Sequence, residues 1–368
     1  MTKARNGFLQ TCGCCPPARA AATSRRNFLA GGVAALGLGA TPARVFAQAA
    51  PPAAPAALPK TVIDVHHHVA PPAFIRELIA RGFNEPPQFN WTVQKSLDDM
   101  DRAGVAAAIS SITTPGVWFG NDGAARRLAR HCNDYAATLM RDHPGRFGMF
   151  ASLPLPDVDG SLREIEYAFD TLHANGVGLM TSFGDKWLGD PAFDPVMEEL
   201  NRRKAVVYTH PTVADCCRGI LPVVHRAVVE FQTDTSRAIG SVLFTGTAAR
   251  FPDIRFIWSH GGGIMPFLYE RFIRMPQLYP NVKPNVPRGV EYEIRKFYYD
   301  VAQVAHPAAL ASLAKVAPTS QILFGTDFPY RTSADHVRGV TEFFTDEADR
   351  RRITRDNALA LIPGLKVG

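Results

Sequence analysis

Short apolar runs alternate with longer segments of helical periodicity from Thr61 to the end of the chain. Each run is mostly β-branched or apolar and ends in polar or turn-forming residues, which is typical of a strand buried on both faces. The expected strands are Thr61–His66, Val105–Ser111, Arg146–Leu153, Val177–Ser182, Ala205–His210, Ile254–His260, Phe297–Ala302 and Gln321–Asp327. Strands that alternate with helices predict a parallel sheet with the helices packed outside it.

The helical segments between the runs complete the pattern. The expected helices are Val93–Ala103, Gly123–Asp142, Ser161–His173, Pro191–Arg203, Ala227–Arg250, Met265–Arg274, Ala308–Ala317 and Ala334–Phe344. Eight such units in about 300 residues fit one closed α/β barrel, the TIM-like (β/α)8 fold, better than two open sheets. Thr212–His225 and Met275–Val290 have no clear period and several prolines, so we expect loop insertions there, at the C-terminal face where barrel enzymes carry their chemistry.

The composition of the chain changes before this region. The first 49 residues contain six of the 40 basic residues and none of the 34 acidic ones, so the remainder carries 34 of each although the whole chain has a net charge of +6. The excess of basic residues therefore belongs to the leader. A folded part without net charge gives no basis for a nucleic-acid partner.

The leader has the layout of a signal peptide. Ser24-Arg25-Arg26-Asn27-Phe28-Leu29 precedes the apolar run AGGVAALGLGA and then Ala47-Gln48-Ala49. A charged region, a short apolar region and small residues, with paired arginines, predict a twin-arginine signal peptide over residues 1–49. The apolar run is too short and too rich in glycine to span a bilayer. We expect an exported protein, periplasmic or extracellular and without stable membrane insertion, in which an Ala/Pro linker over residues 50–60 precedes one domain over residues 61–368.

The cysteines give no sign of a disulfide framework or a structural zinc site. Three of the six lie in the leader, and Cys132, Cys216 and Cys217 remain without a CxxC spacing. We expect these three to be packing or loop residues. A pairing among them stays open in an oxidising compartment.

Histidine or aspartate stands at four of the expected strand ends. The strands end at His66, with His68 beyond it, at His210, at His260 and at Asp327. Because the carboxyl ends of barrel strands meet around one opening, these five residues are expected to be neighbours. Alternation along a strand puts His66 and His68 on one side and turns His67 away.

Imidazole and carboxylate side chains in this arrangement favour a divalent metal. Zinc suits such ligands best and leaves a position for water, whereas manganese or iron tolerates a similar set; no organic cofactor is expected. His260 is the natural proton shuttle, and the three glycines after it are expected to let a substrate approach the backbone.

The motifs IDVHHH, YTHP, SHGGG with a downstream arginine and GTDFP, in this order, resemble those of the amidohydrolase superfamily. The resemblance covers Val62 to Pro363 and is specific to the branch of aminocarboxymuconate-semialdehyde decarboxylase and the hydroxybenzoate decarboxylases of the 6-methylsalicylate type. It implies that His66, His68, His210 and Asp327 bind the metal. It also implies that His260 is the catalytic acid or base.

The same resemblance implies features of the substrate site. Arg271 matches a family position that reaches the neighbouring subunit's site to bind a carboxylate, which implies a homodimer. The muconate enzymes have a second arginine where this chain has Lys95 and Ser96, so a dicarboxylate substrate is disfavoured. Trp187 and Tyr330 are expected to line an aromatic, substrate-binding pocket.

These residues predict a metal-dependent, non-oxidative decarboxylase that acts on a small aromatic or unsaturated carboxylic acid, with a 2-hydroxybenzoate as the leading substrate. The metal would hold the carboxylate and the ortho hydroxyl, and Asp327 or His260 would be catalytic by delivering a proton to the ring carbon.

Two other classes of function remain open at this point. A hydrolase that opens a lactone or cleaves an amide could use a hydroxide activated by the same metal, and the motifs do not separate the two reactions. A non-catalytic binding protein would be marked by a missing ligand, and none is missing.

Overall fold

The computed structural model describes residues 59–362, 364, 365 and 367. The predicted signal peptide and all but the last two residues of the predicted linker lie outside the described residues. Among the helices that are described, none has both the length and the apolar composition needed to cross a bilayer.

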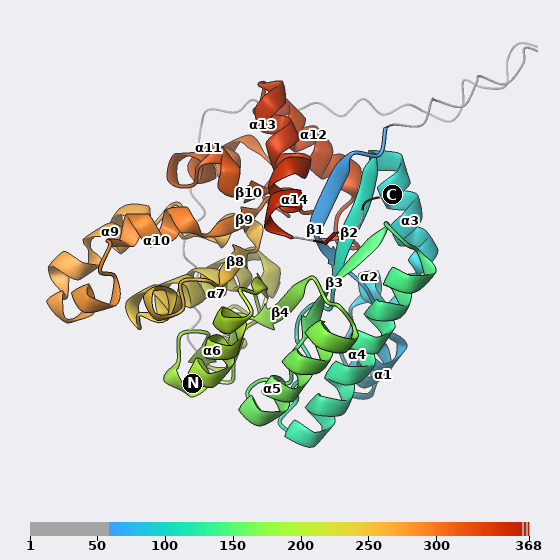
Figure 1. Cartoon of the computed structure of the whole chain (residues 1–368), viewed down its shortest axis with the longest axis horizontal. Coiled ribbons are helices and arrows are strands. Elements are labelled where there is room, and N and C mark those ends of the chain that lie inside the picture. The colour runs from blue at the N-terminus through green and yellow to red at the C-terminus, as the bar shows by residue number, and fades with distance from the viewer. Residues whose placement is uncertain (1–58, 363, 366, 368) are drawn as a thin grey trace, which may run out of the picture. The chain divides into compact units, whose positions relative to one another are not determined.

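Eight parallel strands form the central sheet, with neighbours in the order β1, β2, β3, β4, β7, β8, β9, β10 (Figure 1). Their bounds are β1 Val62–His68, β2 Val105–Ser111, β3 Phe147–Ser152, β4 Gly176–Met180, β7 Val206–His210, β8 Arg255–Trp258, β9 Tyr298–Asp300 and β10 Ile322–Leu323. Each coincides with one of the eight expected strands. A small hairpin of β5 Ser182–Phe183 and β6 Lys186–Trp187 was not expected.

Hydrogen bonds join the two ends of this sheet. The backbone N–H of Val65 donates to the carbonyl of Phe324 at 3.0 Å, and that of His68 donates to the carbonyl of Phe328 at 2.8 Å. His67 and Phe328 form a parallel bridge. Because β1 thus pairs with the chain that follows β10, the sheet curls into a barrel, and the predicted TIM-like fold is confirmed.

Helices surround the strands on the outside (Figure 1). Their bounds are α1 Pro72–Ala80, α2 Pro86–Phe89, α3 Val93–Ala103, α4 Asp122–Asp142, α5 Val158–Glu166, α6 Asp194–Arg202, α7 Arg226–Phe244, α8 Thr247–Arg250, α9 Tyr269–Leu278, α10 Val290–Lys296, α11 Pro307–Val316, α12 Ser333–Phe343, α13 Glu347–Arg351 and α14 Asn357–Leu361. Polar caps set several helix starts: the side chain of Thr92 accepts from the N–H of Lys95, and that of Asn121 from the N–H of Ala124.

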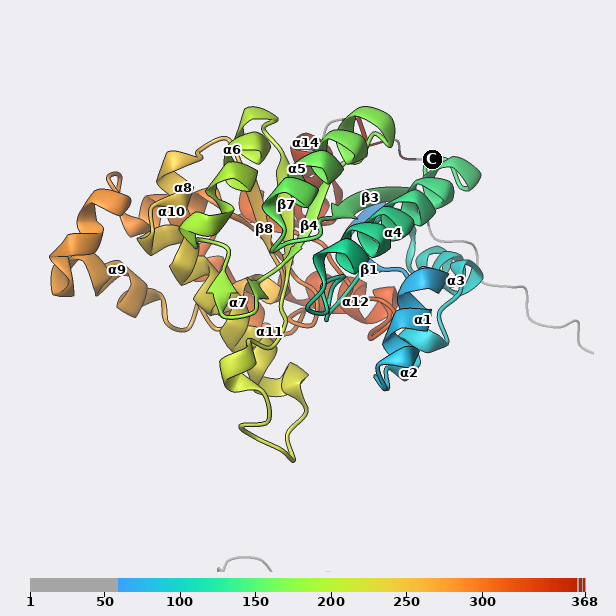
Figure 2. The same cartoon turned by 90° about the horizontal axis from the view of Figure 1, so that it is seen from below.

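Two hydrophobic layers hold the barrel together. Outside, the strands pack against the helices, and α4, α5 and α6 lie side by side (Figures 1 and 2). Inside, side chains such as Ile63, Val65 and Tyr208 form a cluster with Leu361 of α14. The barrel interior is therefore filled by side chains, as in other barrels of this size, and not left as a pore.

Several helix boundaries differ from the expected ones. The expected helix Ala227–Arg250 is two helices, α7 and α8, because Gly246 between them has a left-handed φ of 81°. The expected loop Met275–Val290 is largely helical: α9 runs to Leu278, and a 3-10 helix follows over Pro280–Asn285. Prolines hid this helical character in the sequence.

The other expected insertion lies where it was predicted. Thr212–His225 follows the carboxyl end of β7 and contains only a short 3-10 turn, Asp215–Cys217. Figure 2 shows the segment between β7 and α7, in yellow-green, extending away from the strands. Cys216 and Cys217 lie in this turn and Cys132 is buried on α4; all three are free thiols.

We predict that Gly339→Ala destabilises the fold. A Cβ at Gly339 on α12 would lie 1.9 Å from the carbonyl oxygen of Ala305, so the helix would have to move. Such overpacking costs about 1–3 kcal/mol, and we expect thermal unfolding to begin several degrees lower, roughly 2–4 °C per kcal/mol for a domain of this size.

Gly240→Ala on α7 is the matched control for this substitution. A Cβ at Gly240 would meet the Phe272 ring at 3.6 Å, an ordinary contact. Because alanine is the better helix former, the control should leave the unfolding temperature unchanged or raise it. Equal unfolding temperatures for the two variants would contradict the assigned packing of α12.

Candidate metal centre

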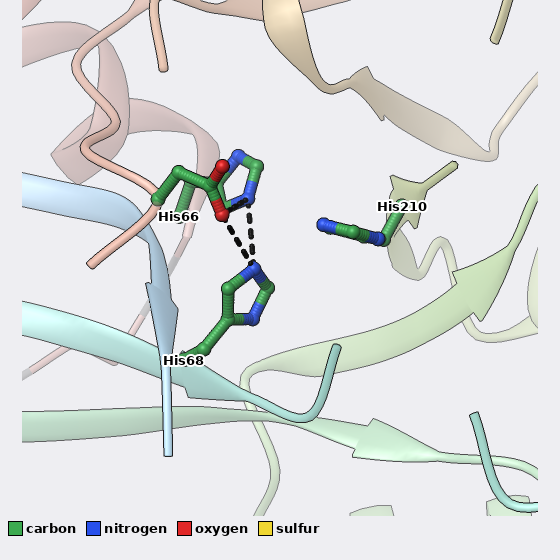
Figure 3. Close-up of side chains that lie close together, drawn as sticks. His66, His68 and His210 are labelled. Carbon is green, nitrogen blue, oxygen red and sulfur yellow. Dashed lines mark hydrogen bonds and ion pairs between the residues drawn. The ribbon is translucent and has the colours of Figure 1, made fainter. Parts of the chain in front are cut away.

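Four buried side chains meet at the carboxyl end of the barrel. His66 and His68 come from β1, His210 ends β7, and Asp327 follows β10. One ligand atom from each lies within 4.8 Å of all the others. Figure 3 shows the three imidazole rings directed toward a common centre. The structure therefore brings together the four residues that were predicted to bind a metal, and they form a divalent-metal site.

Hydrogen bonds fix which nitrogen of two of these rings faces the centre. The Nδ1–H of His66 donates to Asp300 Oδ2 at 2.9 Å, and the Nδ1–H of His210 donates to the carbonyl of Pro211 at 2.9 Å. In the neutral form of each ring the Nε2 atom therefore carries the lone pair that a metal requires.

Three of the four ligand atoms are spaced for a small cation. His66 Nε2 lies 3.1 Å from His68 Nε2, and Asp327 Oδ1 lies 3.3 Å and 3.0 Å from these two atoms. Tetrahedral zinc with bonds of about 2.0–2.1 Å separates its ligands by roughly 3.3 Å. Asp327 Oδ1 is buried and faces the Nε2 atoms of His66 and His68, so a cation between these three atoms would compensate its charge.

Asp300, at the end of β9, is a site residue that the sequence reasoning missed. Besides holding His66, its Oδ1 accepts from the backbone N–H of His260 and of Ala302, each at 3.0 Å. It obeys the same rule of a polar residue at a strand end that revealed the other site residues. The rule could have found it, but FYYDVA contains no recognisable motif.

The second oxygen of Asp327 faces two other side chains. Its Oδ2 accepts a hydrogen bond from Gln303 Nε2 at 2.9 Å and lies 3.4 Å from His260 Nε2. Gln303 has a left-handed φ of 60°, an uncommon conformation for a residue with a side chain. His260 is buried beside the metal ligands without being one of them, and its Nδ1 has no partner in the described part of the chain.

The structure gives a reason for the three glycines after His260 that the sequence did not suggest. Gly261, Gly262 and Gly263 all have positive φ, and a Cβ at Gly263 would lie 2.1 Å from the carbonyl oxygen of Gln232. They let the chain turn and pass close to α7. The structure thus explains them by close packing of backbone on backbone, whereas we expected them to make room for a substrate.

Charge within the cluster sets its protonation. Burial alone lowers the pKa of His66, but the carboxylates of Asp300 and Asp327 raise it to about 10. Burial opposes the charge of Asp327, yet hydrogen bonds from His260 and His66 hold its pKa well below the usual value. Burial lowers the pKa of His210 well below its usual value. Without a cation, the cluster therefore carries a proton on His66 beside an ionised Asp327.

His67 is directed away from the metal ligands, as alternation predicted. Its Nδ1 bonds to Asp64 Oδ2 at 3.0 Å and its Nε2 to Ser96 Oγ at 2.9 Å. Asp64 also accepts from Thr326 Oγ1 at 2.6 Å, which ties β1 to the chain after β10. Lys95, in the position of the missing arginine, is exposed and donates to the carbonyl of Asn90.

A cavity of about 280 Å³ opens onto the centre. The lining includes side chains of the site, His210, His260, Gln303 and Asp327, and other side chains, Glu85, Thr113, Arg226, Phe231 and Tyr330. Tyr330 thus lines this cavity, its role in substrate binding stays a prediction, and burial raises the pKa of its phenol.

The other two predicted substrate-binding residues lie outside this lining. The Trp187 indole N–H donates to Asp234 Oδ1 at 2.8 Å, and Arg271 is exposed on α9. Among the residues that the structure describes, Trp187 is not part of the lining of this cavity. The assignment of Arg271 to a neighbouring subunit's site stays a prediction.

The profile of the family described as Amidohydrolase matches residues 63–364. The chain belongs to the amidohydrolase family. Among curated relatives, "Decarboxylase yanB" of Aspergillus niger is 38% identical over 323 residues, which cover 82% of this amidohydrolase and 87% of the relative. "6-methylsalicylic acid decarboxylase" of Penicillium expansum is 35% identical over 315 residues, which cover 83% of this chain and 97% of the relative.

Solved structures share the fold of this amidohydrolase. A dihydroxybenzoic acid decarboxylase from Polaromonas sp. JS666, solved with bound manganese and the inhibitor 2-nitroresorcinol, superposes with a TM-score of 0.74. The two chains are 20% identical, and the match covers 82% of this chain and 97% of the other. At this identity the likeness concerns the fold.

We predict that metal binding releases a proton at neutral pH. Because the pKa of His66 is raised to about 10 in the metal-free cluster, a cation has to displace the proton that this ring carries at pH 7. We expect calorimetric titration in two buffers of different ionisation enthalpy to give about one proton per cation, with an affinity that falls about tenfold per pH unit on acidification.

Asp300→Asn is the control for the source of this proton. The substitution removes the carboxylate that raises the pKa of His66, so fewer protons should be released per cation. Identical heats of binding in the two buffers for the unsubstituted protein would show that His66 is not protonated, and would contradict the prediction.

We also predict that Gln303 supports metal binding through Asp327. Gln303→Leu removes the donor to Asp327 Oδ2 and leaves a buried carboxylate oxygen less satisfied. Loss of such outer contacts typically costs about 10–100-fold in metal affinity. Gln303→Gly should lose as much affinity while raising thermal stability, because glycine relieves the left-handed backbone. Competition with a chelator of known affinity measures this effect, and an unchanged affinity in both variants would refute it.

Proposed function

We propose that this amidohydrolase is a metal-dependent, non-oxidative decarboxylase of a small aromatic acid that carries an ortho hydroxyl, a 2-hydroxybenzoate. The observation that carries the proposal is a cavity lined both by His260 and by two of the four metal ligands, His210 and Asp327. The named functions of the relatives at 35% and 38% identity support the same reaction. When bound, a divalent cation supplies Lewis acidity toward the carboxylate and the ortho hydroxyl of such an acid.

His260 is the proposed proton donor. It is buried at the cavity, and its Nε2 lies 3.4 Å from Asp327 Oδ2. Asp327 is the weaker candidate, because Gln303 donates to its Oδ2 and the pKa of the carboxyl lies well below the usual value. Asp327 therefore acts as an acceptor that orients His260, and the imidazolium delivers the proton.

The reaction balances with one proton. The proton from His260 forms a bond to the ring carbon that bears the carboxylate. The bond between that carbon and the carboxylate carbon then breaks, its electron pair restores the aromatic ring, and carbon dioxide leaves. His260 regains its proton from solvent, so no oxidant or organic cofactor is consumed. Phe231 and Tyr330 give the cavity the partly apolar lining that suits an aromatic ring.

The finer assignments of metal and assembly belong to the same proposal. Three imidazoles and one carboxylate suit zinc, with manganese as the alternative. A homodimer is proposed because Arg271 is exposed on α9 and because exposed apolar side chains lie near it, with Phe267 87% exposed and Leu278 61% exposed. Export by the twin-arginine route is proposed from the paired arginines and apolar run of the leader.

We predict that the metal-loaded protein releases carbon dioxide from 2-hydroxybenzoates and that, in heavy water, the product carries one deuterium at the former carboxyl position. His260→Ala should lower kcat by about 10²–10⁴-fold, while metal analysis finds the ion still bound because His260 is not among the ligands. Mass spectrometry locates the label.

Two outcomes would contradict this assignment. A protein that releases no carbon dioxide from hydroxybenzoates, but places solvent oxygen in a new carboxylate from a lactone or amide, would be the hydrolase. Retained turnover in His260→Ala would remove His260 as the proton donor while leaving the reaction in place.

A further inference from the structure

An ion pair lines the same cavity, and in the described part of the chain neither of its residues forms a hydrogen bond or ion pair with a metal ligand. Glu85 precedes α2 and Arg226 is the first residue of α7, and the NH2 group of Arg226 donates to Glu85 Oε1. Their side chains are 13% and 33% exposed. The two residues are 141 positions apart in sequence, and both line the cavity.

Arg226 keeps an unused donor in this pair. Its Nε is buried and has no hydrogen-bond partner among the described residues. A buried guanidinium N–H without an acceptor is unfavourable, and a substrate that fills the cavity would remove the remaining water from it. A substrate atom that accepts a hydrogen bond there would therefore be favoured.

The pair is close enough to the reaction site to face a bound substrate. Glu85, Arg226 and Tyr330 line one cavity of about 280 Å³ together with His210, His260 and Asp327 of the site. Tyr330 lies beside the metal ligands: its backbone N–H donates to the carbonyl of Asp327 at 2.9 Å, and its ring centroid lies 6.2 Å from that of His68. A small aromatic acid bound at the metal therefore shares this cavity with the ion pair.

The chemistry of the pair selects among ring substituents. A second carboxylate would be repelled by Glu85, and an apolar group would leave the Arg226 Nε unsatisfied. A hydroxyl suits both partners, because its O–H donates to the Glu85 carboxylate and its oxygen accepts from Arg226. In a 2-hydroxybenzoate the carboxylate on C1 and the hydroxyl on C2 would face the metal. C4 and C5 lie across the ring from these two carbons, so their substituents would face away from the metal.

We propose that Glu85 and Arg226 form a specificity clamp for a second hydroxyl, on C4 or C5 of the ring. The natural substrate is then a dihydroxybenzoate that carries one hydroxyl beside its carboxylate and one remote from it. This inference rests on the proposed decarboxylase function and names the substrate class of the same site.

The test compares matched acids that differ only in the remote group. The acids are 2,4- and 2,5-dihydroxybenzoate and the corresponding 2-hydroxy-methylbenzoates, titrated into metal-loaded protein in a His260→Ala background so that they are not consumed. We expect the hydroxyl acid to bind at least about tenfold more tightly than its methyl partner at one of the two positions, the size typical of hydrogen bonds to charged groups.

Substitutions at the pair should abolish this preference. With Glu85→Leu and Arg226→Leu together, the hydroxyl and methyl acids should bind within about twofold of each other. Glu85→Gln keeps the shape and removes the charge, so it should weaken the preference and admit 2-hydroxybenzene-1,4-dicarboxylate, which the unsubstituted pair excludes. The control is the exposed pair of Arg250 and Asp194, whose replacement by leucines should leave the preference unchanged.

The possible results test the Glu85–Arg226 clamp and the decarboxylation reaction independently. Equal affinity of hydroxyl and methyl acids for the intact pair at both positions overturns the clamp, as does a preference that survives in both Glu85→Gln and the double variant. Turnover is measured separately, with His260 restored. A hydroxyl preference without release of carbon dioxide would retain the clamp and reject decarboxylation, and carbon dioxide release without the preference would do the reverse.

Discussion

The hydrogen bonds that close the barrel also assemble its metal centre. His66 and His68 lie on β1, and Asp327 follows β10, so the site spans the seam between the first strand and the last. The backbone N–H of Asp327 donates to the carbonyl of His66 at 2.8 Å, and Asp64 holds Thr326 beside it. Closure of the fold and the positions of three ligands are therefore one constraint, because neither can form without pairing across this seam.

Burial of charge at this seam is balanced by connected partners. Asp300 orients His66 with one oxygen and fixes the backbone of His260 and Ala302 with the other. Asp327 divides its oxygens in a similar way, with Oδ1 toward the ligand nitrogens and Oδ2 toward Gln303. Asp300 thus connects the metal ligand His66 to the backbone of His260, and Asp327, itself a ligand, lies next to the His260 side chain. The position of the proposed proton donor, His260, therefore depends on the same carboxylates that hold the metal site.

The sequence predicted the parts of this design that have a period or a motif. Strand runs located the eight strands, and polar residues at their ends located the four metal ligands and His260. Asp300 follows the same rule but was overlooked because FYYDVA reads as an ordinary buried strand. Gln303 could not be predicted, because its role depends on a left-handed backbone and on a partner 24 residues away. The glycines after His260 were visible, but their packing against α7 depends on tertiary structure.

The residues proposed to select the ring substituent are different from those that hold the metal and move the proton. The metal ligands lie at ends of strands, where a one-residue change in register would turn a side chain to the other face of the sheet. Glu85 and Arg226 lie instead at the starts of α2 and α7, in the connections that follow β1 and β7, and nothing in the local sequence pattern relates them. Loops of this kind tolerate change that barrel strands do not. A barrel with the same metal centre can therefore acquire a different ring preference through two side chains at its rim, without any change in the residues that hold the metal or move the proton.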